Sequence, residues 1–270
     1  IFYKGDIKME FNTNQKEAIH TIDGNMVVIA AAGSGKTSVL TYRILNMVKN
    51  HGIDPTTILA VTFSKKAKES IEQRLGKLGV ANVNVETFHS LALKIITSTY
   101  GYGKYKVWTA SWEKEKALKE ICCDLLGLCR NKDDVPYNGI LRFLGIQKTN
   151  MLGSTDSLIY SDDDPYPDDR MKKIYKMYED YKKDKSYIEF DDFLNMANQC
   201  FDKFPDILKF YQNKYLYVLS DEFQDVSMAQ SLLLKRINNK NTMIVGDPLQ
   251  AIYSFRGGRS EYIMRFDQDY

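Results

Sequence analysis

The stretch AAAGSGKTSVL, residues 30–40, decides the fold that this sequence predicts. It is preceded by MVVIA (residues 26–30), a short apolar run typical of a strand buried on both faces of a parallel sheet. After it, apolar side chains recur at helical spacing over residues 40–48. A strand, a glycine-rich loop and a helix in this order form a P-loop, in which backbone N–H groups and the helix dipole hold phosphate oxygens. The stretch therefore predicts a phosphate-binding site in an α/β fold.

The residue types within this loop suit separate tasks. Gly33 and Gly35 let the backbone close around phosphates. Lys36 can reach the β and γ phosphates, and the Thr37 hydroxyl can ligate magnesium. Ala30 stands where the P-loop pattern has glycine; the alternative, a small-residue turn with a coincidental lysine, is disfavoured by the flanking strand and helix. The predicted nucleotide-binding residues of the loop are Ala32, Gly33, Ser34, Gly35, Lys36, Thr37 and Ser38.

Further buried strands and helices extend the pattern. Apolar runs resembling the first are ILAVTF (58–63), VNVETF (83–88), YLYVLS (215–220) and TMIVG (242–246). Helical spacing returns over residues 67–78, directly after the second run. Strands that alternate with helices predict an α/β fold with a parallel, doubly wound sheet flanked by helices.

The middle of the chain differs from both ends. Between residues 103 and 186 no strong buried-strand signal occurs, whereas residues 112–129 and 171–178 have helical spacing. We therefore predict a mostly helical insertion at 103–186, between a first segment (1–102) and a second segment (187–270) of one sheet-containing lobe. A lysine-rich part of the insertion could line a nucleic-acid path, but a solvated face is the favoured interpretation for Lys172, Lys173, Lys182, Lys183 and Lys185.

A second motif, YVLSDEFQD, places two carboxylates directly after a buried strand. Ligands of parallel α/β sheets bind at the carboxyl ends of the strands, so Asp221 can hold magnesium through water. Glu222 can then polarise an attacking water. The alternative is a solvated acidic turn, which the apolar strand before it and the P-loop elsewhere disfavour.

The amino-acid composition restricts the kinds of site and the compartment that we expect, but it does not indicate a function. Lys and Arg number 37 and Asp and Glu 35, so the net charge of +2 neither indicates nor excludes nucleic acid. The four cysteines form no CxxC pair and there are only 3 histidines, so we expect no zinc or iron–sulfur site. Free thiols suggest a reducing compartment and hence a soluble, cytoplasmic protein, although pairing among the four remains open. Neither a signal-peptide core nor a membrane-spanning stretch is visible.

Six segments in order narrow the function: FNTNQKEAI (11–19), AAAGSGKT (30–37), ILAVTFSKKAKESIEQRL (58–75), TFHSLA (87–92), DEFQD (221–225) and VGDPLQAIYSFRGG (245–258). They resemble the Q motif and motifs I, Ia, Ib, II and III of UvrD/Rep-like superfamily 1 DNA helicases. The resemblance covers nearly the whole chain outside the insertion, and this family tolerates alanine at the position of Ala30. It implies a RecA-like P-loop NTPase lobe that binds ATP and Mg²⁺.

The resemblance also implies residue roles. Gln15 would recognise adenine, since its amide can both donate to and accept from the base edge. Lys36 and Thr37 would hold phosphate and magnesium, with Asp221 as the second magnesium residue. Glu222 would be the catalytic base, Gln250 would sense the γ-phosphate, and Arg256 would couple the site to motif III.

Aromatic side chains in the same motifs could contact single-stranded DNA. Stacking on unpaired bases needs no sequence readout, which suits a motor that moves along a strand. The predicted DNA-binding residues are Phe63, His89, Tyr253 and Phe255. The alternative is that these aromatic residues belong to the core, and for His89 in particular that it is a packed histidine.

The family places ATP between two RecA-like lobes, and motifs IV to VI with their arginines lie on the second. We expect that second lobe to be absent from these 270 residues. The parent would be an ATP-dependent helicase or translocase moving 3′ to 5′ on single-stranded DNA, with protein partners in repair or replication and no membrane. The isolated chain would bind ATP weakly, hydrolyse it slowly and not unwind DNA. Alternatives are a non-motor nucleotide- or DNA-binding module, which would need no catalytic base, and a P-loop kinase, which would leave TFHS unexplained.

Overall fold

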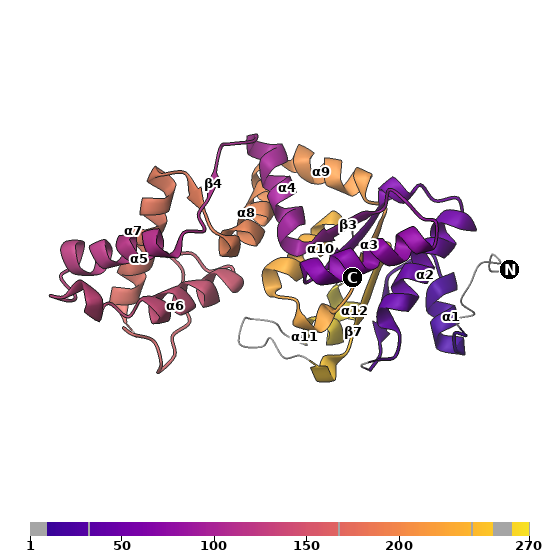
Figure 1. Ribbon diagram of the computed structural model, residues 1–270, viewed down its shortest axis with the longest axis horizontal. Coiled ribbons are helices and arrows are strands. Elements are labelled where there is room, and N and C mark those ends of the chain that lie inside the picture. The colour runs from indigo at the N-terminus through magenta and orange to yellow at the C-terminus, as the bar shows by residue number, and fades with distance from the viewer. Residues whose placement is uncertain (1–9, 32, 167, 239, 251–260, 270) are drawn as a thin grey trace.

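A five-stranded parallel sheet forms the centre of one half of the molecule (Figure 1). The computed structural model describes residues 10–31, 33–166, 168–238, 240–250 and 261–269. The strands run in the order β1-β7-β6-β2-β3, with bounds β1 Met26–Ile29, β2 Ile58–Thr62, β3 Asn84–Thr87, β6 Tyr217–Ser220 and β7 Thr242–Gly246. All pairings are parallel, so the carboxyl ends of the strands lie at one edge. The predicted α/β fold with a parallel sheet is confirmed.

Helices cover both faces of this sheet, because successive strand side chains point to opposite sides. Ile58 and Ala60 of β2 pack in a core with α1, α2 and α3, whereas Leu59 and Val61 pack with α4, α8 and α10. The elements of this half are α1 Thr13–His20, α2 Lys36–Lys49, η1 Pro55–Thr57, α3 Lys65–Lys77, α4 Phe88–Tyr100, α8 Phe190–Lys203, α9 Pro205–Lys214, η4 Phe223–Asp225, α10 Met228–Ile237, η5 Pro248–Gln250, α11 Glu261–Met264 and α12 Phe266–Asp269.

The chain between α4 and α8 builds a second, helical group at the other end of the molecule (Figure 1). Trp108, Phe143 and Tyr178 are fully buried in a core of its own. Its elements are α5 Ser111–Lys119, the π-helical turn η2 Glu120–Leu125, η3 Lys132–Asp134, α6 Tyr137–Thr149 and α7 Asp169–Asp184. Two short strands that we did not predict, β4 Lys106–Val107 and β5 Tyr187–Ile188, pair in parallel where the chain enters and leaves this group.

Two expectations for this region were wrong. The helix predicted to continue to Cys129 ends at Leu125, because Gly127 takes a left-handed conformation (φ 62°) and reverses the chain. Lys182 was expected on a solvated face, but it is buried among the carboxylates of Glu179, Glu189 and Asp192.

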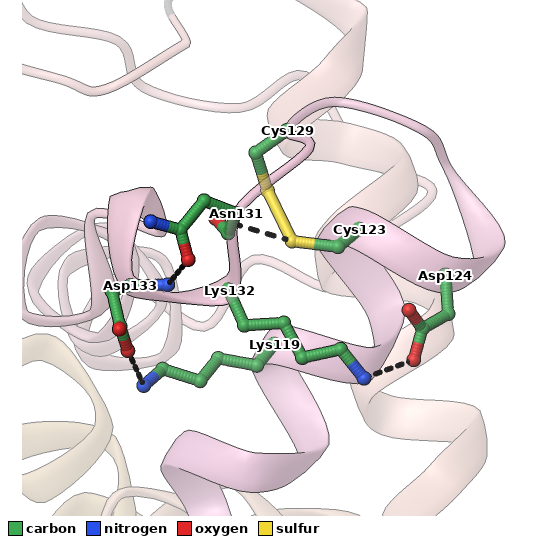
Figure 2. The surroundings of a disulfide bond; sticks show 7 residues. All are labelled: Lys119, Cys123, Asp124, Cys129, Asn131, Lys132 and Asp133. Atoms are coloured by element: carbon green, nitrogen blue, oxygen red, sulfur yellow. Dashed lines mark hydrogen bonds and ion pairs between the residues drawn. A yellow bond between two sulfur atoms is a disulfide. The ribbon is translucent and has the colours of Figure 1, made fainter.

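The cysteines also differ from the expectation of free thiols. A disulfide joins Cys123 and Cys129 (Figure 2), whereas Cys122 and Cys200 are free and buried. The reversal at Gly127 brings the paired Cα atoms to 4.9 Å, within the range that a disulfide needs. Among the described residues, no helix is long and apolar enough to cross a membrane.

Candidate nucleotide-binding site

The predicted P-loop connects the end of β1 to the first turn of α2 at the carboxyl edge of the sheet. Gly33 and Gly35 have φ of 73° and 83°, the left-handed region that favours glycine, and Gly35 caps α2. The hydroxyl oxygen of Ser34 is buried and finds no hydrogen-bond partner in the described part of the chain. A buried, unpartnered hydroxyl beside a helix N-terminus is a feature that a phosphate oxygen can satisfy. Ala32 lies outside the described residues.

Four predicted side chains converge at this edge from two separate parts of the sequence. Lys36 and Thr37 begin α2, whereas Asp221 and Glu222 follow β6. Thr37 Oγ1 donates a hydrogen bond of 2.8 Å to Asp221 Oδ2. Lys36 Nζ lies 3.9 Å from Glu222 Oε2 and donates to the carbonyl oxygen of Ala30 at 3.2 Å. The structure thus assembles a cation, a hydroxyl and two carboxylates around one point.

The two adjacent carboxylates occupy different environments. Asp221 is 3% exposed, and burial raises its pKa, an effect that the hydrogen bond from Thr37 offsets only in part and the charge of Glu222 reinforces. The Glu222 side chain is 41% exposed and can therefore meet solvent. Its backbone has φ of 53°, a conformation that a non-glycine residue adopts only where its surroundings hold it. One carboxylate is shielded and the other is presented to water.

The residues present fit a magnesium ion. Thr37 Oγ1 and Asp221 Oδ2 are hard oxygen donors of the kind that Mg²⁺ prefers, usually with retained waters. Burial raises the pKa of Asp221, and Thr37 and the charge of Lys36 compensate for this only in part, so a divalent cation would supply further positive charge. Thr37 and Asp221 are therefore the candidates to hold the metal.

A hydrogen-bonded chain that sequence analysis missed connects Glu222 to the end of β7. Gln224, only 2% exposed, donates to Glu222 Oε2 at 2.9 Å and accepts from the backbone N–H of Asp247 at 2.9 Å. Gln250 Nε2 in turn donates to the Asp247 carboxylate. A side chain at Gly246 would come within 2.5 Å of Gln224 Oε1, so only glycine fits there. The position of Gln224 in DEFQD, two residues after Glu222, was a signal that could have indicated it.

Gln15, predicted to recognise adenine, lies against the P-loop. Its Nε2 donates to the carbonyl oxygen of Ser34 at 2.8 Å, and its Oε1 accepts from the Asn12 N–H at 2.9 Å in the capping box of α1. An amide has two donors and two acceptor lone pairs, so one of each stays free for a base edge. Sequence analysis also missed Arg74, whose guanidinium donates to Ser38 Oγ at 3.1 Å.

The residues predicted to contact DNA lie in different surroundings. Phe63 follows β2 and is half-buried. The His89 ring lies 6.1 Å from the Phe190 ring and 6.4 Å from that of Phe193, and burial lowers its pKa although Asp191 opposes this. His89 therefore has the contacts of the packed histidine that we kept as its alternative. The other two predicted DNA contacts, Tyr253 and Phe255, lie outside the described residues, as does Arg256, which was predicted to couple the site to motif III.

A parallel sheet that carries a strand–P-loop–helix unit and an acidic pair at its carboxyl edge defines the class of P-loop NTPases. Within this class, residues 11–270 match the UvrD/REP helicase N-terminal domain, and the chain belongs to this family. It is 35% identical to DNA helicase II of Rickettsia typhi over 96% of the chain and 40% of that protein. It is 32% identical to the ATP-dependent DNA helicase PcrA of Leuconostoc citreum over 96% of the chain and 35% of that protein. The chain thus spans well under half the length of these relatives.

Proposed function

We propose that this chain is the ATP-binding, first RecA-like lobe of an ATP-dependent DNA helicase that moves 3′ to 5′ along single-stranded DNA. Residues 103–186 would form a helical subdomain inserted between segments 1–102 and 187–270. The observation that carries the proposal is the convergence of Lys36 and Thr37 with Asp221 and Glu222. The printed names of the relatives, which are DNA helicases, support the direction of the proposal.

The protein groups would act on ATP as follows. Backbone N–H groups of the loop and Lys36 would bind the β and γ phosphates, while Gln15 would hold the adenine edge. When bound, magnesium at Thr37 and Asp221 would neutralise charge on the phosphate oxygens. Glu222 would accept a hydrogen bond from the attacking water at its exposed carboxylate and orient that water toward the γ-phosphate.

The hydrogen-bonded chain beyond Glu222 offers a route from hydrolysis to movement. Gln250 would contact the γ-phosphate, and it is linked to Glu222 through Asp247 and Gln224. Loss of the γ-phosphate would release Gln250, which the predicted Arg256, Tyr253 and Phe255 follow in the sequence. Stacking of bases on such aromatic residues and on Phe63 is worth roughly 1–3 kcal/mol per base, enough to hold a strand without reading it.

The 270 residues alone should be a weak enzyme. An arginine supplied across a phosphoryl-transfer site is worth about 10³ to 10⁵ in rate, and the family carries such arginines on a second lobe. A non-motor binding module is the less favoured alternative, because it would need neither Glu222 nor the amide that holds it. Partners in DNA repair or replication, and a cytoplasmic location, rest on the same proposal.

The test measures binding of a fluorescent ATP analogue to the folded chain, with and without Mg²⁺, beside ATP hydrolysis with and without single-stranded DNA. We expect Mg²⁺-dependent binding by the wild type and by Glu222→Gln, and binding weakened about 10- to 100-fold in Lys36→Ala, because a charge-assisted bond to phosphate is lost. Hydrolysis should stay very slow. A folded wild-type chain that binds no nucleotide would overturn the proposed site, and rapid DNA-stimulated turnover abolished by Glu222→Gln would show that one lobe suffices.

A further inference from the structure

Two cysteines lie together on the insertion, at the end of the molecule away from α2 (Figure 1). Cys123 and Cys129 are both half-buried and joined by a disulfide (Figure 2). The other two, Cys122 and Cys200, are fully buried, and burial raises the pKa of the Cys122 thiol to about 11 and also raises that of Cys200. Since thiolates are the reactive form and solutes must reach them, the surface pair is the one suited to thiol–disulfide exchange.

The backbone brings these two cysteines together without help from the sulfur atoms. The N–H of Leu126 donates to the carbonyl oxygen of Ile121 at 3.0 Å, and that of Leu128 donates to the carbonyl oxygen of Cys122 at 2.8 Å. Gly127 supplies the left-handed residue that this reversal requires (φ 62°). Because the turn is held by its own hydrogen bonds, the two side chains would remain close after reduction.

The surroundings also suit the reduced state. Cys123 Sγ lies 3.8 Å from the carbonyl oxygen of Asn131 (Figure 2), to which a thiol can donate a weak hydrogen bond. An oxidised and a reduced pair can therefore occupy the same site without a change of fold.

The disulfide is the covalent tie between η2, which carries Cys123, and the segment that follows Gly127. Two ion pairs cross the same gap, Lys132 with Asp124 at 2.5 Å and Lys119 with Asp133 at 3.1 Å (Figure 2). Both include largely exposed carboxylates, and exposed ion pairs contribute little to stability. Opening the disulfide would thus remove the covalent tie and leave the segment held by these ion pairs and by the two backbone hydrogen bonds of its first turn.

We propose that Cys123 and Cys129 form a reversible thiol–disulfide site, oxidised by a low-molecular-weight disulfide, whose closure fastens residues 126–134 onto η2. The thiolate of one cysteine attacks a sulfur of the small disulfide, forms a mixed disulfide and releases one small thiolate. The second cysteine's thiolate attacks the protein sulfur of that mixed disulfide, closes the bond and releases the second small thiolate. The protein pair loses two electrons, which the small disulfide gains, and the two cysteine protons end on the two released thiols.

This site has a local consequence beyond the sulfur atoms. Lys119 and Lys132 line a surface hollow of about 370 Å³ next to the exposed ring of Trp112. Lys132 belongs to the fastened segment, so the redox state sets whether this lysine is held opposite Trp112. In a reducing compartment disulfides are usually transient, and such a pair would report a change in the thiol pool.

The test equilibrates the 270-residue chain in mixtures of reduced and oxidised glutathione, stops exchange with acid, labels free thiols under denaturing conditions and locates the label by peptide mass spectrometry. We expect Cys123 and Cys129 to lose the label together as oxidised glutathione rises and to regain it when reduced glutathione is added. The label on Cys122 and Cys200 should stay complete throughout. Hydrogen exchange of residues 126–134 should be slower in the oxidised state by on the order of tenfold.

Several outcomes would overturn the proposal. A label that persists on Cys123 and Cys129 at every ratio, or glutathione that stays attached to either, would show that no internal disulfide closes. Unchanged hydrogen exchange would remove the fastening role. In Cys123→Ser and, as a second variant, Cys129→Ser, the remaining surface cysteine should carry glutathione; an internal disulfide in either variant would assign the pairing to other cysteines.

Discussion

The sheet edge that carries the P-loop and the helical group between α4 and α8 each bury a lysine, and the two lysines have different surroundings. Lys36 is 8% exposed and Lys148 on α6 is 4% exposed. In the described part of the chain, Lys36 meets one carboxylate, that of Glu222, at 3.9 Å. Lys148 meets three at ordinary ion-pair distance: Glu179 at 3.0 Å, Glu189 at 3.1 Å and Asp192 at 2.8 Å. A buried cation with few carboxylates around it is prepared for an anionic ligand, whereas a saturated one serves the fold.

The saturated lysine belongs to a network that joins the insertion to the lobe. Lys182 of α7 contacts Asp192 of α8 at 2.7 Å, and the Tyr178 hydroxyl donates to Glu189 at 3.0 Å. Burial alone would lower the pKa of Lys148, but the surrounding carboxylates raise it well above its usual value. Because α8 packs on the sheet face covered by α4, this network fixes the insertion to that face.

The largest expected effect compares the same substitution at both lysines. Lys148→Met should lower the free energy of unfolding by about 3–5 kcal/mol, because it leaves Glu189 and Asp192 buried with too few cations. Lys36→Met should change it by less than about 1 kcal/mol while weakening nucleotide binding about 10- to 100-fold. Urea unfolding followed by circular dichroism measures both. Equal losses of unfolding free energy in the two variants would contradict the distinction between a lysine that is free to bind an anionic ligand and one whose charge is already neutralised.

Low pH should destabilise the insertion through protonation of Glu189. Burial would raise the pKa of Glu189, but Lys148 and Lys182 lower it from 4.5 to about 2. A carboxyl whose folded pKa is lowered contributes stability above its unfolded pKa and loses it as pH falls. Stability worth on the order of 3 kcal/mol should therefore disappear between pH 4.5 and about pH 2. Unfolding free energies measured across this range should fall more steeply for the wild type than for Lys148→Met; parallel curves would contradict the network.

The same contrast explains how much the sequence could predict. The P-loop, the acidic pair and the parallel sheet follow from local patterns: an apolar run, two glycines and a lysine that stand within a few residues of one another. Lys148 carries no such signal, because its partners Glu179, Glu189 and Asp192 lie more than thirty residues away in sequence. From sequence alone, a lysine on a predicted helix is assigned to the solvent-exposed face, because its distant carboxylate partners are not known.

Shorter-range features were missed for other reasons. The Cys123–Cys129 pair depends on the reversal at Gly127, and the helical spacing gave no sign that the helix would end before it. The hydrogen bond between Gln224 and Asp247 requires the end of β7 to lie beside η4. Only the order of the strands in the sheet brings these two segments together. Local motifs in the sequence therefore predicted the candidate catalytic side chains. The residues that hold these side chains in place could be identified only from the tertiary fold.

A third prediction concerns Gln224, which donates a hydrogen bond to the proposed catalytic carboxylate of Glu222 and neutralises no charge. Gln224→Leu should cost about 1–3 kcal/mol, because it leaves the buried N–H of Asp247 without an acceptor. The matched control is Gln212→Leu, where an exposed amide donates to the carbonyl oxygen of Arg236, and the change should stay within about 0.5 kcal/mol. Thermal unfolding compares the two. If both variants behave alike, the chain from Glu222 to Asp247 has no structural role.

The smallest expected effect is that of an Asp→Asn substitution on the free energy of unfolding, and its sign should differ between the two regions. Burial raises the pKa of Asp221, so the folded state favours its protonated form, and its contribution to stability is lost as pH rises above the unfolded value of 3.8. Asp221→Asn should therefore stabilise the chain at neutral pH by up to about 1 kcal/mol while weakening Mg²⁺-dependent nucleotide binding. At Asp192 burial is outweighed by Lys148 and Lys182, which lower the pKa, so Asp192→Asn should destabilise. Chemical denaturation measures the free energy of unfolding of both variants. We expect a carboxylate that lacks a cation to gain stability when its charge is removed, whereas a carboxylate in a saturated network should lose it.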